Sequence, residues 1–135
     1  MTLTEDNIAD YADTLVLQAR GRGVTLDYSE ASVEQMDALF ALSDELLRGE
    51  NFPEAQRNLV IFYGGCYLGE TLARCFGGVW KFEPNWYDST LVFTVPEGGL
   101  QLRPFHKVHQ RVADDETGNR LADYRDGLKL RLAGI

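Results

Sequence analysis

The segment from residue 54 to residue 76 constrains the fold more than any other part of the sequence. It is predicted as one long helix with apolar residues on all sides, and such a helix is buried on most of its surface. Gly64, Gly65 and Gly69 lie inside it, although each glycine costs about 1 kcal/mol of helix stability relative to alanine. Because Gly65 and Gly69 share one helix face, another backbone can come close there. We therefore expect a central helix, seated through its glycine face on the sheet or on another helix.

The rest of the chain is predicted as helices before this segment and strands after it. A length of 135 residues suits one domain. The pattern therefore predicts a single α+β domain over residues 1–135, in which the central helix packs on an antiparallel meander of three or four strands. The other predicted elements are helices at 4–20, capped by Thr4, and at 30–48, strands at Val79–Glu83, Thr90–Val95 and Leu100–Pro104, and a final helix from about Arg120.

The excess of acidic over basic residues lies entirely in the first part of the chain. The net charge is −8, and residues 1–58 contain 12 acids and 4 bases, whereas residues 59–135 contain 9 of each. Phosphates would be repelled, which argues against a nucleic acid partner, whereas a basic protein partner would be attracted. Solubility alone is the other explanation. The helix at 30–48 carries its acids opposite its apolar face, and these are the predicted partner-binding residues: Glu30, Glu34, Asp37, Asp44 and Glu45.

Two neighbouring aromatic residues add a second candidate for partner binding. Trp86 and Tyr87 lie in "EPNWYDS", which is predicted as a hairpin loop. Exposed aromatic side chains on a rigid loop often anchor protein interfaces. The alternative is that Trp86 folds back over the sheet.

The sequence contains no recognisable enzyme motif, but one acidic residue is unusual. Glu70 lies in mostly apolar surroundings on the central helix. It could form an ion pair with Arg74 one helical turn later, or act as a general acid or base with a pKa raised by burial. In the second case His106 or His109 would assist it. The two histidines could also share one helix face and bind a metal, but no further ligands accompany them, so neither a metal nor a cofactor is predicted.

The cysteines and the N-terminal sequence indicate the compartment. Cys66 and Cys75 would lie ~13 Å apart along the central helix, too far for a disulfide, and are expected as free thiols. No apolar run is long enough to span a membrane, and no signal peptide is evident. A cytoplasmic location is expected.

Three stretches carry a resemblance to known proteins: "LDYSEASVEQMDAL", "GGCYLGETLARCFGGVW" and "RPFHKVHQRVADDETGNRLADYRDGL". With them the chain resembles a group of short bacterial α+β domains of unassigned function. Some similar small acidic domains are immunity proteins that neutralise toxins. The resemblance implies a bacterial protein and brings no catalytic residues. The leading hypothesis is therefore a non-catalytic protein-binding domain, with a basic toxin as one conceivable partner. The alternatives are an enzyme built on Glu70 and a structural or oligomeric accessory domain.

Overall fold

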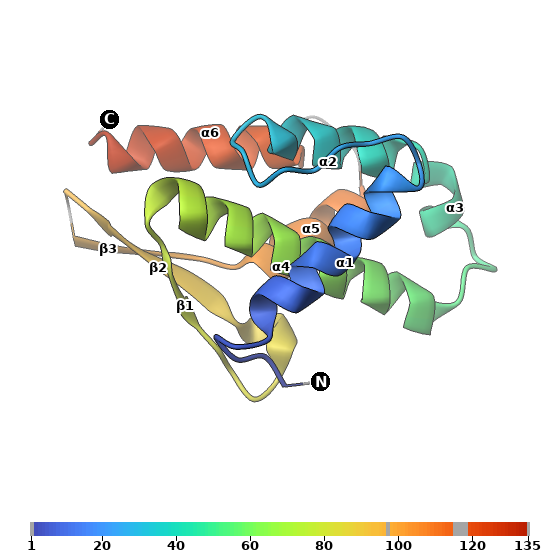
Figure 1. Cartoon of the computed structure of the whole chain (residues 1–135), viewed down its shortest axis with the longest axis horizontal. Helices are drawn as coiled ribbons and strands as arrows, with labels where there is room; N and C mark the ends of the chain where they lie inside the picture. The colour runs from blue at the N-terminus through green and yellow to red at the C-terminus, as the bar shows by residue number, and fades with distance from the viewer. Residues whose placement is uncertain (1, 97, 115–118, 135) are drawn as a thin grey trace.

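The central helix α4 extends over Glu54–Phe76, with the bounds that the sequence predicts. The structure is a computed structural model and describes residues 2–96, 98–114 and 119–134. Helices α1 (Ile8–Arg20) and α5 (Pro104–Ala113) make the most extensive contacts with α4. Figure 1 shows α4 running through the middle of the molecule between these two helices. Its middle part, residues 61–72, is buried at every position but one, which confirms its predicted role as the central element.

The glycine face of α4 is covered, but by aromatic rings rather than by another backbone. A Cβ atom added at Gly65 would lie 2.2 Å from the Phe105 ring of α5, and one added at Gly69 would lie 2.2 Å from the indole of Trp80. The sequence-based expectation of a close backbone neighbour is therefore wrong in its details. Removing the side chains at these positions creates sockets for two large rings, and this burial offsets the helix propensity that the glycines lose.

The predicted helix at 30–48 is two helices, α2 (Ser32–Ala41) and α3 (Asp44–Arg48). The chain leaves the helical conformation at Ser43, whose φ is −127°. The break turns Asp44 and Leu47 into the protein and leaves Leu46 64% exposed, although the single-helix prediction placed Leu46 in the core. Helix α1 begins at Ile8, later than predicted, and Asn7 occupies its N-cap position without a side-chain cap hydrogen bond. Thr4 and Asn7 bond each other across the preceding turn, where the Thr4 hydroxyl accepts from the backbone N–H of Asn7.

Three antiparallel strands form one sheet in the order β1 (Val79–Lys81), β2 (Thr90–Val95) and β3 (Gly98–Leu102). The side chains of β2 alternate as predicted, with Leu91, Phe93 and Val95 buried and Thr94 exposed. The last strand ends before its predicted limit, because Pro104 begins α5.

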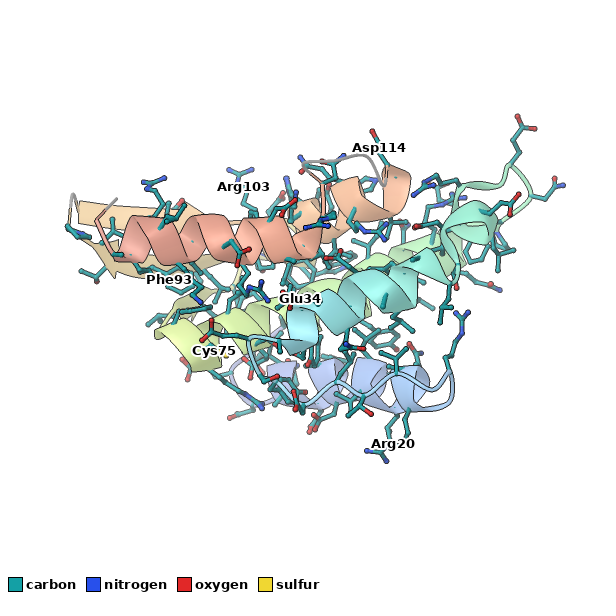
Figure 2. The ribbon with its side chains drawn as sticks, turned by 90° about the horizontal axis from the view of Figure 1, so that it is seen from above. Arg20, Glu34, Cys75, Phe93, Arg103 and Asp114 are labelled. Atoms are coloured by element: carbon teal, nitrogen blue, oxygen red, sulfur yellow. The ribbon has the colours of Figure 1, made fainter. Side chains whose placement is uncertain are left out.

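Helix α6 (Leu121–Leu132) completes the α+β fold and packs on α2 and β2. Viewed from above, α2 runs between α6 and α1 (Figure 2). None of the described helices is both long enough and apolar enough to cross a membrane.

Candidate functional site

The acidic face of α2 is turned toward α5 and α6. Asp37 accepts hydrogen bonds from the backbone N–H groups of Leu121 and Ala122, both at 3.0 Å. These are the first two residues of α6, whose N–H groups have no partner within the helix. Asp37 therefore caps α6 from a different helix, and its negative charge lies at the positive end of the α6 dipole.

Asp44 forms an ion pair inside the protein. The Arg111 side chain is 4% exposed, and its Nη1 and Nη2 atoms lie 2.8 Å and 3.3 Å from the two carboxylate oxygens of Asp44. The Nε atom of Arg111 donates to Asp37 at 3.2 Å. One arginine from α5 thus connects α2 and α3. Burial of a charge in this way is tolerated because its donors are occupied by carboxylates.

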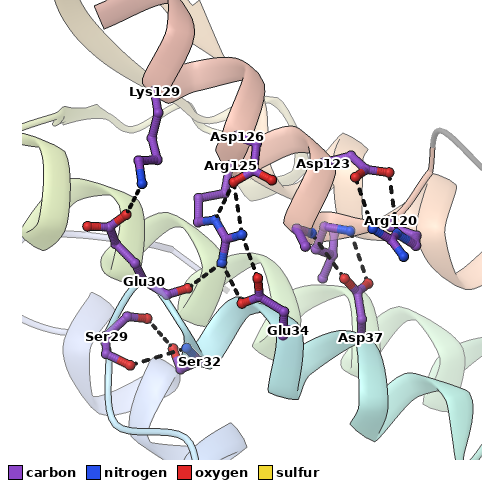
Figure 3. Close-up of polar contacts among 12 residues, drawn as sticks. Ser29, Glu30, Ser32, Glu34, Asp37, Arg120, Asp123, Arg125, Asp126 and Lys129 are labelled. Atoms are coloured by element: carbon purple, nitrogen blue, oxygen red, sulfur yellow. Dashed lines mark hydrogen bonds and ion pairs between the residues drawn. The ribbon is translucent and has the colours of Figure 1, made fainter. Parts of the chain in front are cut away.

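A second arginine connects α2 with α6 (Figure 3). The guanidinium of Arg125 contacts both oxygens of Glu34, at 2.5 Å and 2.6 Å, and donates to the carbonyl of Glu30 at 2.7 Å. Lys129 pairs with the Glu30 carboxylate at 2.8 Å. The hydrogen bonds from Arg125 hold the pKa of Glu34 below its ordinary value, since they stabilise the ionised form.

Four of the five acids predicted to bind a partner are therefore engaged within the chain, and only Glu45 differs. Glu30, Glu34, Asp37 and Asp44 are paired with bases from the second half of the sequence. Glu45 is exposed and forms no ion pair within the part of the chain that the structure describes. A partner at the first four would have to displace existing contacts, whereas Glu45 is available.

The surroundings of Glu45 combine negative charge with exposed apolar side chains. Leu42 is 56% exposed and Leu46 is 64% exposed, although large apolar residues are usually covered. Glu45 and Leu46 border a hollow of about 460 Å³ together with Glu50 and Phe52. We refer to the residues Leu42, Glu45, Leu46, Glu50 and Phe52 as the α3 surface.

A second hollow borders α3 at Leu47. It has a volume of about 240 Å³, and its exposed wall is mostly apolar. Helix α1 contributes Leu15, and Arg22 just after α1 donates a hydrogen bond to the Ser43 hydroxyl across the hollow. Helix α3 thus borders this hollow through Leu47 and the first hollow through Glu45 and Leu46. The remaining lining residues are Gln18, Leu39, Phe40, Leu47 and Val60.

The predicted aromatic pair lies in the loop of the β1–β2 hairpin, as expected, and this loop forms a short 3₁₀ helix, η1 (Trp86–Asp88). Trp86 is half-buried, and its ring makes edge contacts with Phe62 at 5.0 Å and Phe105 at 5.1 Å. Trp86 therefore folds back, but onto α4 and α5 and not over the sheet as the alternative had it.

Tyr87 brings the two histidines together. Its ring stacks on His106 with centroids 4.1 Å apart, and its hydroxyl lies 2.7 Å from Nδ1 of His109. Asp88 is 3.6 Å from Nε2 of His106, and burial raises the pKa of Tyr87. These contacts occupy the side chains of the group with one another, which favours a packing or contact role. Among the described residues, no group of three or more His, Cys, Asp or Glu side chains is arranged to hold a metal ion.

Glu70 lies elsewhere and has partners of its own. Its carboxylate accepts a hydrogen bond from the Trp80 indole at 2.9 Å and pairs with Arg74 at 3.1 Å. Within the described residues, neither His106 nor His109 is among its hydrogen-bond or ion-pair partners. The ion pair with Arg74, expected from their spacing, is confirmed. Glu70 fixes Trp80 above Gly69, and this arrangement serves packing.

The sequence does not predict the α3 surface, because the pattern of residues 30–48 predicts one continuous helix without the break at Ser43. One signal was present in the sequence. Together with the other apolar residues of the 30–48 helix, Leu42, Leu46 and Leu47 are too many to be buried on one helix face. Such an excess indicates either a break or an exposed apolar face.

Comparisons of this chain with protein-family models, with curated proteins and with solved structures return no match.

Proposed function

We propose that this chain is a non-catalytic protein-binding domain, and that the α3 surface holds a basic, amphipathic helix of the partner. The supporting observation is that the exposed Leu46 borders one hollow with two acids, Glu45 and Glu50, while the exposed Leu42 follows the end of α2 just before α3. Exposed apolar residues with a polar margin are typical of interaction sites. A helix that docks in this way places apolar side chains on the leucines and basic side chains near the acids.

The expected partner is still basic, but its contact site is the α3 surface and not the acidic face of α2. The ion pairs of Glu34 and Asp37 would have to be broken by any partner that bound there, and replacing contacts yields less affinity than adding new ones. Binding at the α3 surface leaves these pairs intact. Neutralisation of a toxin, which the resemblance to immunity proteins implies, is one setting for such binding, and the cytoplasm is its proposed location.

Affinity purification from the source cells, with four forms of the chain, tests the proposal. The wild type and a Val79→Ser control are expected to retain the same partner, because Val79 is equally exposed but lies on β1. A Leu42→Ser/Leu46→Ser variant is expected to lose that partner, and Glu45→Lys to weaken its retention most at low salt. Circular dichroism verifies that each variant is folded.

Two results would contradict the proposal. One is that no partner is retained even at low salt. The other is that a partner is retained equally by the wild type and by the double leucine variant, which would place the contact elsewhere. An enzyme centred on Glu70 has no comparable support, since the carboxylate is held by Trp80 and Arg74.

A further inference from the structure

Gly127 in α6 differs from the glycines of α4 in its surroundings. A Cβ atom added at Gly64, Gly65 or Gly69 would come within 3 Å of a packed side chain, whereas one added at Gly127 would meet nothing within 4 Å. Glycine weakens the interior of a helix, so its presence there needs a reason. In α4 the reason is that neighbouring side chains pack against the glycines. No contact within the described part of the chain accounts for Gly127.

The space beside Gly127 is a groove between α6 and the edge strand β3. It has a volume of about 420 Å³, and Leu100, Leu102, Tyr124 and Leu128 line it together with Gly127. The exposed lining is more apolar than polar. Strand β3 has a neighbour on one side only, since the sheet order is β1-β2-β3. The groove is therefore an open apolar face beside a free strand edge.

Besides the buried Lys107, the groove is lined by two charged residues of α6, and these two have a symmetric arrangement. Asp123, Gly127 and Arg131 follow one another at intervals of four residues and so lie along one face of α6. The Asp123 side chain is 42% exposed and forms a surface ion pair with Arg120 at 3.1 Å, so a second base would share this carboxylate. Arg131 is exposed and has no ion pair within the described residues. An acid and a base at equal distances on either side of a glycine form a self-complementary pattern.

We propose that a second copy of this chain binds in the groove, with the two α6 helices antiparallel and crossing at Gly127. A two-fold axis at this position places Arg131 of each copy opposite Asp123 of the other. The absent side chain of Gly127 lets the helices approach closely, and the apolar groove residues are covered. The α3 surface lies at the opposite end of the molecule (Figure 1), so this proposal is independent of the proposed function.

Charge reversal tests the arrangement by sedimentation or by size exclusion with light scattering. The wild type is expected to dimerise as its concentration rises, and Asp123→Arg or Arg131→Asp alone is expected to give monomers. The double variant Asp123→Arg/Arg131→Asp is expected to restore the dimer, because it exchanges the two charges across the axis. Arg20→Asp is the matched control, since Arg20 lies on α1, away from α6 (Figure 2). A wild type that stays monomeric up to its solubility limit, or a double variant that does not recover, would overturn the proposal.

Cross-linking gives a second measurement that does not depend on charge. In a Cys75→Ser background, Gly127→Cys is expected to form a covalent dimer under mild oxidation, because the two thiols would meet at the axis. Cys66 is buried and does not interfere. Thr25→Cys, at an exposed position in the connector before α2, is the control. Equal amounts of covalent dimer from the two variants would overturn the crossing at Gly127.

Discussion

The substitution Gly69→Ala is expected to destabilise the protein, although alanine is the better helix former. The new Cβ atom would lie 2.2 Å from two atoms of the Trp80 indole, whereas non-bonded carbon atoms pack at about 3.5–4.0 Å. The ring must therefore move by roughly 1.5 Å. It cannot move freely, because its N–H group donates to Glu70 at 2.9 Å and its face stacks on Phe82.

The magnitude follows from three contributions. Alanine stabilises the helix by about 1 kcal/mol relative to glycine. Overpacking at this contact costs about 1–3 kcal/mol, and loss of the bond from Trp80 to the mostly buried Glu70 carboxylate costs about 1–3 kcal/mol more. With middle values of about 2 kcal/mol for each of the two costs, we expect a net decrease of about 3 kcal/mol in the free energy of unfolding.

Gly127→Ala is the matched control, because it is the same change inside a helix but into open space. Urea unfolding of dilute protein, followed by tryptophan fluorescence, is expected to show stabilisation by up to about 1 kcal/mol for Gly127→Ala. A Gly69→Ala variant as stable as the wild type, or stabilised to the same extent as Gly127→Ala, would refute the role of Gly69 as a socket for the Trp80 ring.

Three further predictions concern individual polar side chains and the two cysteines. Asp37→Ala should lower the free energy of unfolding by about 2–4 kcal/mol in urea, because it removes a helix cap and one partner of a buried arginine, whereas Asp37→Asn keeps an acceptor for the cap and should lose less; equal losses would contradict this. Glu34→Gln should be less stable than the wild type at neutral pH, and the difference should shrink as the pH falls below the ordinary carboxyl pKa of 4.5, because the lowered pKa of Glu34 contributes stability that is lost on protonation; a difference independent of pH would refute it. Burial raises the pKa of the Cys66 and Cys75 thiols, so a thiol reagent at neutral pH should label both slowly until urea unfolds the chain, and rapid labelling of native protein would be the contrary result.

The sequence predicts those elements whose pattern is local. The bounds of α4 and the alternation in β2 follow from residues within each element, and both are confirmed. The break at Ser43 was not predicted, because it depends on contacts between distant residues: Arg22 bonds the Ser43 hydroxyl, and Arg111 holds Asp44 inside the protein. Without these contacts the pattern of residues 30–48 remains compatible with one helix.

The acidic face of α2 shows a further limit of reading one helix at a time. A helical pattern identifies the side that carries the acids but does not show what faces them. The bases that pair with Glu34 and Asp37 lie 74 to 91 residues later in the chain, on α5 and α6. The acids of this face were predicted to bind a separate partner, but Glu34 and Asp37 instead bind bases from the second half of the same protein.

The uneven charge of the sequence therefore has two separate consequences in the folded protein. Acids of α2 and α3 meet bases of α5 and α6, so part of the charge difference between the two halves is used in joining them. Glu45 and Glu50 take part in no such ion pair within the described residues, and their charge remains at the surface beside exposed leucines. Exposed charges are screened by salt within about 8 Å at physiological ionic strength, whereas the pair of Asp44 with Arg111 is largely shielded from the solvent. Salt should therefore weaken attraction of a basic partner to the α3 surface more than it weakens the contacts that hold the helices together.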